Sequence, residues 1–285
     1  MRKIIGLFLT IILMSCGKNR NITTDVSKVK VEFSLDRFDQ DFYQSSKSLG
    51  VLKNEYPFLF PRSVHDSIWN HKRIDADEVE LFEETQKVYS NITDLKEQLT
   101  ILFKHVKYYN PKFNSPRVIS MLTNIDYENR IVYRDSLLFI SLDAYLGENH
   151  EFYGDYPAYV KQNNRKQHII VDVASNIVDK QIFPRNKRTF IDKMIYKGKK
   201  MYIKDIYLNQ LPDHEKIGYR KEKLDWALAN EEQIWRYFVE KDLLFSTDKN
   251  LDRRFLDIAP FSKFYMEEDL DRLALVSTSK VKHIK

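Results

Sequence analysis

The sequence predicts a single α+β domain that is mostly helical and has a small sheet near its middle. Long segments repeat apolar residues at helical spacing, and two shorter segments between them are rich in β-branched and aromatic residues. The chain contains 18 Phe and 17 Tyr but only one Cys, so its core must form without a disulfide within the chain. No internal repeat or low-complexity segment divides the sequence.

The first part of the chain is predicted to contain a strand and then a helical region. Residues 31–38 alternate apolar and polar side chains, as a half-buried strand does. Residues 77–109 have helical spacing, and a break is expected near Asn91 because Asp94 and Glu97 are placed as in a capping box. The apolar face of the helix after this break consists of Leu95, Leu99, Leu102 and Val106.

In the rest of the chain, two strands precede the remaining helices. Residues 117–122 and 131–142 are the predicted strands, and a turn joins them. Helices are predicted over 167–182 and 221–244. Two segments lie between these helices, a helical stretch at 186–196 and a tyrosine-rich segment at 199–208.

The N-terminus has the features of a bacterial lipoprotein signal. An uncharged apolar run over 4–14 follows two basic residues and is shorter than the roughly 20 residues that a membrane-spanning helix needs. The run leads into Leu-Met-Ser-Cys at 13–16, which resembles a lipobox, so Cys16 is the predicted site of diacylglycerol attachment. The alternative is an ordinary signal peptide with a chance cysteine. We expect a protein anchored to an inner or outer bacterial membrane, with its body outside the cytoplasm.

The composition limits the classes of binding partner and cofactor that the sequence predicts. Two of the 46 basic residues, Arg2 and Lys3, leave with the predicted leader, and the remainder nearly balance 41 acidic residues. Such a balance does not indicate a nucleic-acid-binding protein. The chain has only seven Gly and neither GxGxxG nor GxxxxGK[ST], and no cofactor is predicted.

Familiar catalytic motifs are missing from the sequence. There is no GxSxG motif, and the one cysteine is assigned to lipid. Two His-Glu pairs occur at 150–151 and 214–215, but Gly154 and Gly218 stand four residues after the two histidines. A zincin needs a second histidine at that position so that both imidazoles face one Zn²⁺. The sequence therefore predicts no metal site and no catalytic residue.

One helix carries polar residues that are candidates for a cleft. Asp172, Ser175, Asn176 and Asp179 share one face of the helix predicted at 167–182. This face is either a functional groove or the solvated side of an amphipathic helix.

Glu231 is the remaining candidate, because it is an acid on an apolar face of the helix predicted at 221–244. Such an acid must be paired, protonated or at the rim of a cleft. We also expect Trp226 and Trp235 to anchor the core at this helix. The apolar face around Glu231 consists of Leu224, Leu228, Trp235 and Phe238.

Several segments in order resemble the GldB gliding-motility lipoprotein family of the Bacteroidetes. Besides the lipobox, they are the segments at 142–147, 153–157, 217–219, 226, 230–235 and 260–265. The resemblance covers residues 16 to about 271. It implies a role in gliding motility beside the type IX secretion machinery, other gliding and secretion proteins of the cell envelope as partners, and no enzyme activity.

The resemblance also includes a distant similarity to zincin-type metalloproteases. It places the helix at 168–182 where a zinc-binding helix would lie, and Glu231 near a third ligand. Because the histidine ligands are missing, the similarity implies a zincin-like scaffold that has lost its metal. A membrane-anchored, zincin-type hydrolase is the alternative function.

The predicted organisation has four parts. Residues 1–15 are the signal peptide, 16–30 a flexible tether, 31–271 the GldB-like domain, and 272–285 a short, atypical tail. Relatives are expected to continue with a further helix where this tail stands, so we expect an uncovered apolar surface beneath it.

Overall fold

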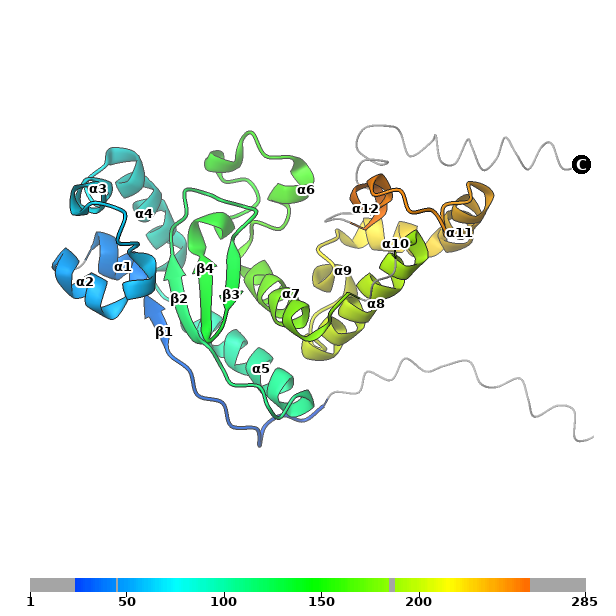
Figure 1. Cartoon of the computed structure of the whole chain (residues 1–285), viewed down its shortest axis with the longest axis horizontal. Helices are drawn as coiled ribbons and strands as arrows, with labels where there is room; N and C mark the ends of the chain where they lie inside the picture. The colour runs from blue at the N-terminus through cyan, green and yellow to red at the C-terminus, as the bar shows by residue number, and fades with distance from the viewer. Residues whose placement is uncertain (1–23, 45, 185–187, 257–285) are drawn as a thin grey trace, which may run out of the picture.

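The computed structural model of the chain describes residues 24–44, 46–184 and 188–256 (Figure 1). Its helices and strands follow one another in an α+β arrangement, as predicted. They are β1 (Leu35–Arg37), α1 (Phe38–Tyr43), α2 (Leu49–Glu55), α3 (Asp66–Lys72), α4 (Ala76–Tyr89), α5 (Thr93–Tyr109), β2 (Arg117–Met121), β3 (Ile131–Arg134), β4 (Leu137–Ser141), α6 (Ala158–Lys161), α7 (Ile169–Gln181), α8 (Phe190–Tyr207), α9 (Asp213–Lys216), α10 (Lys221–Ala229), α11 (Glu231–Glu240) and α12 (Asn250–Phe255).

The sheet has four strands in the order β1-β2-β4-β3. β2 pairs in parallel with β1 and with β4, and β3 pairs with β4 in an antiparallel hairpin. Side chains of successive residues on β4 point to opposite faces, so the sheet supports a separate apolar cluster on each face.

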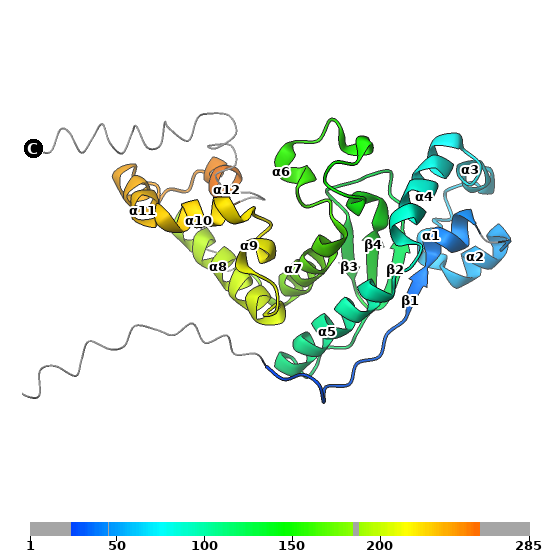
Figure 2. The ribbon, with the colours of Figure 1, turned by 180° about the vertical axis from the view of Figure 1, so that it is seen from behind.

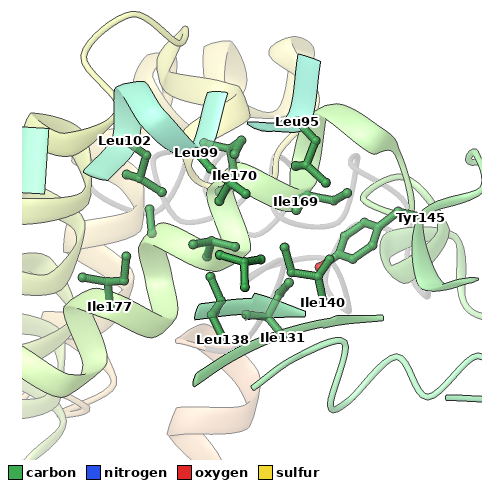
Figure 3. Close-up of a cluster of buried hydrophobic side chains, with 14 of the residues drawn as sticks. Leu95, Leu99, Leu102, Ile131, Leu138, Ile140, Tyr145, Ile169, Ile170 and Ile177 are labelled. Carbon is green, nitrogen blue, oxygen red and sulfur yellow. The ribbon is translucent and has the colours of Figure 1, made fainter. Parts of the chain in front are cut away.

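The main core lies between one face of the sheet and the helices α5 and α7 (Figure 3). Leu138 and Ile140 of β4 meet Leu99 of α5 and Ile169 of α7, and all four are inaccessible to solvent. Both helices present apolar residues three and four positions apart, which is why each buries a continuous stripe.

The opposite face of the sheet is covered by the N-terminal helices. Ile119 of β2 packs with Phe38 and Phe42 of α1 and Leu52 of α2. At the other side of the molecule, beyond α7, a smaller cluster joins α8, α11 and α12 (Figures 1 and 2). Its buried residues are Phe190, Phe238, Leu251 and Phe255.

Several predicted elements are confirmed. The helical region at 77–109 is two helices, α4 and α5, which part at 90–92, and the helix predicted at 167–182 is α7. However, α5 already begins at Thr93, whose amide donates to Asn91, so the expected capping box at Asp94 does not start the helix.

Three predicted elements differ because pairing and packing override the local pattern. Only Leu35–Arg37 of the strand expected at 31–38 pairs with a neighbour. The single strand expected at 131–142 is a hairpin, since Asp135 turns the chain with a φ of 54°. Over the described residues, one helix, α8, replaces the two segments predicted at 186–196 and 199–208.

The prediction of one long helix at 221–244 is also wrong, because the chain breaks at Asn230 into two helices, α10 and α11. As a result Leu228 is 63 % exposed and Trp235 42 % exposed, so Trp235 is not the core anchor that we expected. Within the described residues, no helix combines the length and the apolar character that a membrane span requires. The predicted leader, Cys16 and the tail at 272–285 lie outside these residues.

Candidate functional site

The polar side chains that come together in the structure lie where α7 meets β3. α7 forms because Ile169, Ile170, Val173 and Ile177 repeat at helical spacing and are buried against the sheet and α5. The helix is preceded by a short 3-10 turn, Lys166–His168, that places His168 at its N-terminal end. One turn later, Asp172 faces the residues of the hairpin and of the chain after β4.

Asp172 is held by three side chains. The Tyr145 hydroxyl donates a hydrogen bond of 2.8 Å to Oδ2, and Nε of Arg130 lies 3.1 Å from the same oxygen. Nε2 of His168 lies 3.4 Å from Oδ1. Burial by itself would raise the pKa of Asp172, but the neighbouring His168 and Arg130 side chains and the hydrogen bonds outweigh it and hold the pKa below its usual range. Asp172 is therefore ionised at neutral pH.

Arg130 connects this carboxylate to the neighbouring loop. It is almost fully buried, its Nη1 donates to Oδ1 of Asn164 at 3.0 Å, and its guanidinium carbon lies 5.4 Å from the centre of the Tyr145 ring. Arg130, Tyr145, Asn164, His168 and Asp172 form what we call the Asp172 cluster. A planar guanidinium suits this position because it can bind a carboxylate, an amide and an aromatic face together.

The loop between α9 and α10 closes the cluster on one side. The Gly218 carbonyl accepts hydrogen bonds from Gln162 at 2.8 Å and from Asn163 at 3.2 Å. Gly218 has a φ of 71°, and a Cβ at this position would lie 2.8 Å from Nδ2 of Asn163 and 3.4 Å from Cε1 of His168. Only glycine fits this approach without strain.

Lys204 of α8 contacts α7 about one turn after Asp172, at Ser175. Its ammonium group donates to Oγ of Ser175 at 3.3 Å, and burial lowers the pKa of Lys204 to about 8, although the charge of Asp172 opposes the shift. A lysine with a lowered pKa is a feature of some catalytic sites and also of buried structural lysines.

The candidate cleft residues fall in different surroundings. Asp172 is in the cluster, but Ser175 and Asn176 donate to backbone carbonyls of their own helix, those of Val171 and Asp172. Asp179 is exposed and pairs with Lys200 at 2.8 Å. These contacts indicate that the polar face of α7 makes hydrogen bonds and an ion pair within the chain, and they argue against an open groove at this face.

Glu231 does not occupy an apolar stripe. It is exposed in the first turn of α11, because the break at Asn230 ends the face formed by α10. An acid in a first helical turn is favoured by the helix dipole, which explains Glu231 without a ligand.

Sequence reasoning missed four members of the Asp172 cluster, Arg130, Tyr145, Asn164 and His168. The spacing of His168 and Asp172, four residues apart on one helix, was the only local signal. Within the described part of the chain, Nδ1 of His168 and Nδ2 of Asn164 are buried without a hydrogen-bond partner. The same part contains no group of three or more His, Cys, Asp or Glu side chains arranged to hold a metal ion.

The fold and the site define an α+β protein with an internal ionic cluster between α7 and the β3-β4 hairpin. The model of the GldB_lipo family, described as gliding motility protein GldB, matches residues 19–272. The chain belongs to this gliding-motility family, whose name also indicates lipoproteins. Searches of curated proteins and of solved structures found no match.

Proposed function

We propose that this protein is a non-enzymatic accessory or assembly component of the gliding and type IX secretion machinery. It would be held at a membrane of the cell envelope by diacylglycerol on Cys16 and would act through contacts with other envelope proteins. The family match supports the role in gliding motility. The observation that carries the non-enzymatic part is the enclosure of Asp172 by Tyr145, Arg130 and His168.

A carboxylate that acts on a substrate needs at least one oxygen directed to the substrate. Both oxygens of Asp172 face side chains of the protein, and the best placed cation, Arg130, is committed to Asp172 and Asn164. The cluster therefore supports a structural role, in which it links α7 to the β3-β4 hairpin and to the loop before α7.

The zincin-like scaffold and the metal-dependent hydrolase remain less well supported. The turn before α7 offers His168 and α7 offers Asp172, but the described residues provide no third ligand beside them, and Glu231 is an exposed residue of another helix. Nothing in the described residues favours a hydrolase.

Substitution of Asp172 by Asn separates a structural tie from a catalytic group. We expect motility and the melting temperature of the purified protein to fall together, and motility to recover when cells glide at a lower temperature. Loss of motility at every temperature, with an unchanged melting temperature, would contradict the proposal. Crosslinking in the native membrane, followed by pull-down, identifies the partner.

Lipid attachment is tested at Cys16 itself. The Cys16→Ala variant should lose metabolic labelling by a clickable fatty acid and should leave the membrane fraction, because the thiol is the acyl acceptor. Ser15→Ala is the matched control, since it keeps a small residue before the cysteine and should be labelled normally. Acyl labelling that persists in the Cys16→Ala variant would disprove the attachment site.

A further inference from the structure

Helix α8 has an unusual combination of charge and exposed apolar surface. It carries five lysines against two aspartates, whereas the chain as a whole is nearly balanced. Ile195 is 53 % exposed and Tyr202 is 68 % exposed. These two residues are seven positions apart, so they lie on the same side of the helix, with Lys199 between them.

A cavity of about 290 Å³ continues this face toward the end of α7. Ile195, Tyr196 and Lys199 line it from α8, and Phe183 lines it from the segment after α7. Phe183 is 76 % exposed, one of the most exposed aromatic side chains in the described chain. We call Phe183, Ile195, Lys199 and Tyr202 the α8 face.

The positive charge of this region is not fully neutralised within the protein. Asp179 pairs with Lys200, and Asp205 pairs with Lys216. Among the described residues, Lys197 and Lys199 are exposed and have no acidic partner.

Internal packing does not explain Gly198, which stands in the middle of α8 beside Ile195 and Lys199. A Cβ at Gly198 would meet no atom within 4 Å. A glycine inside a helix costs about 1 kcal/mol relative to alanine, so its presence there fits the close approach of something outside the chain.

The start of the described chain lies near the end of α8. The Thr24 hydroxyl is 2.6 Å from the hydroxyl of Tyr109, at the end of α5. The ring of Tyr109 is 6.4 Å from that of Tyr207, the last residue of α8. Figures 1 and 2 show the blue start of the described chain beside α5.

The tether that starts at this position is long enough for the lipid attachment site to lie beside α8. The eight residues from Cys16 to Thr24 span at most about 26–29 Å when extended. The 18 residues of α8 are about 27 Å long. An acylated Cys16 can therefore sit in a bilayer that also touches α8.

We propose that the α8 face rests on the anionic phospholipid surface to which the chain is tethered. This inference rests on the proposed attachment at Cys16. Aromatic and aliphatic side chains of a surface helix enter the boundary between headgroups and acyl chains, while lysines at its edges bind lipid phosphates. The contact would set the orientation of the body and so decide which surfaces face its protein partners.

A single-cysteine probe tests the contact, because the sequence has one native cysteine and the proposed lipid attachment blocks it. Tyr202→Cys is labelled with a polarity-sensitive fluorophore in the acylated full chain, which is placed in vesicles of phosphatidylcholine with or without phosphatidylglycerol. Ile68→Cys on α3, 57 % exposed and at the other side of the molecule, is the matched control (Figure 1). In anionic vesicles, we expect a blue shift and quenching by spin-labelled lipid at position 202 and neither effect at 68.

A charge reversal tests the role of the lysines in the same assay. Lys199→Glu should reduce the inserted population of the probe at 202 by about five-fold or more, since each lysine near an anionic surface contributes about 1 kcal/mol. Arg62→Glu, an exposed residue of the loop before α3, makes the same charge change away from α8 and should change insertion by less than two-fold.

Three outcomes overturn the inference. If the probes at 202 and 68 behave alike in acylated protein, the α8 face does not touch lipid, although the attachment at Cys16 stands. If position 202 becomes buried only in native envelope membranes and not in vesicles, the face binds a protein. If the chain carries no fatty acid, the proposed attachment fails and the inference fails with it.

Discussion

Removal of the negative charge at the centre of the Asp172 cluster should destabilise the whole fold. In the Asp172→Asn variant, Tyr145 keeps an acceptor, but Arg130 is left almost fully buried without a counter-charge. Loss of one partner of a buried ion pair costs about 3–5 kcal/mol. We expect the free energy of unfolding at pH 7, measured by urea denaturation with circular dichroism, to fall by about this amount.

The pH dependence gives a second test of the same substitution. The folded state lowers the pKa of Asp172 from its ordinary value of 3.8, so the carboxylate stabilises the fold above that pH and progressively less as the pH falls below it. The difference between the native chain and Asp172→Asn should therefore be constant above about pH 5 and smaller by about 1 kcal/mol at pH 3.

An exposed carboxylate on the same helix provides the control. Asp179 pairs with Lys200 at the surface, so Asp179→Asn should change the free energy of unfolding by less than about 0.5–1 kcal/mol. If Asp172→Asn costs no more than Asp179→Asn at pH 7, the cluster does not tie α7 to the hairpin and the structural role that we assign to it is refuted.

Other substitutions test the packing around this region. Phe238→Ala should cost about 3–5 kcal/mol because the ring is buried, whereas Trp235→Ala should cost clearly less, and equal changes in melting temperature would contradict the exposure of Trp235. Gly218→Ala should destabilise by about 1–3 kcal/mol, since its Cβ meets Asn163 at a positive φ, and a neutral effect in urea denaturation would refute this. The pKa of Lys204 is lowered from 10.5 to about 8, so the native chain should gain stability as the pH rises from 8 to 10.5. The Lys204→Met variant should be more stable than the native chain at pH 7 by about 1–3 kcal/mol, and its stability should not show the rise between pH 8 and 10.5. Lower stability of the variant at pH 7 would count against a buried, uncompensated ammonium.

Local sequence patterns predicted the helices well where their apolar faces meet the main core. Leu95 and Leu99 of α5 and Ile170 and Ile177 of α7 are all buried, because residues three or four apart share one side of a helix. The pattern was less informative at 131–142, because the polar residues Asp135 and Ser136, which form the turn of the hairpin, were included in one continuous strand.

The candidate site was only partly predictable. Asp172 was found because it is polar on an amphipathic helix, and Ser175, Asn176 and Asp179 were grouped with it by the same spacing. Their neighbours differ, however, and the same spacing cannot distinguish a buried ion from a solvated one. Glu231 was misplaced because an uninterrupted helix was assumed through Asn230.

The sequence by itself determined the class of the fold, its main helices and the family resemblance, since each depends on neighbours along the chain or on ordered motifs. The tertiary structure alone decided the partners of Asp172. Arg130 precedes it by 42 positions and reaches it because β3 packs against α7. Tyr145 arrives from the turn after β4, which no helical or strand periodicity connects to α7. The strength of an ionic contact depends on how much water the assembled body excludes around it, and that exclusion exists only after distant segments have packed.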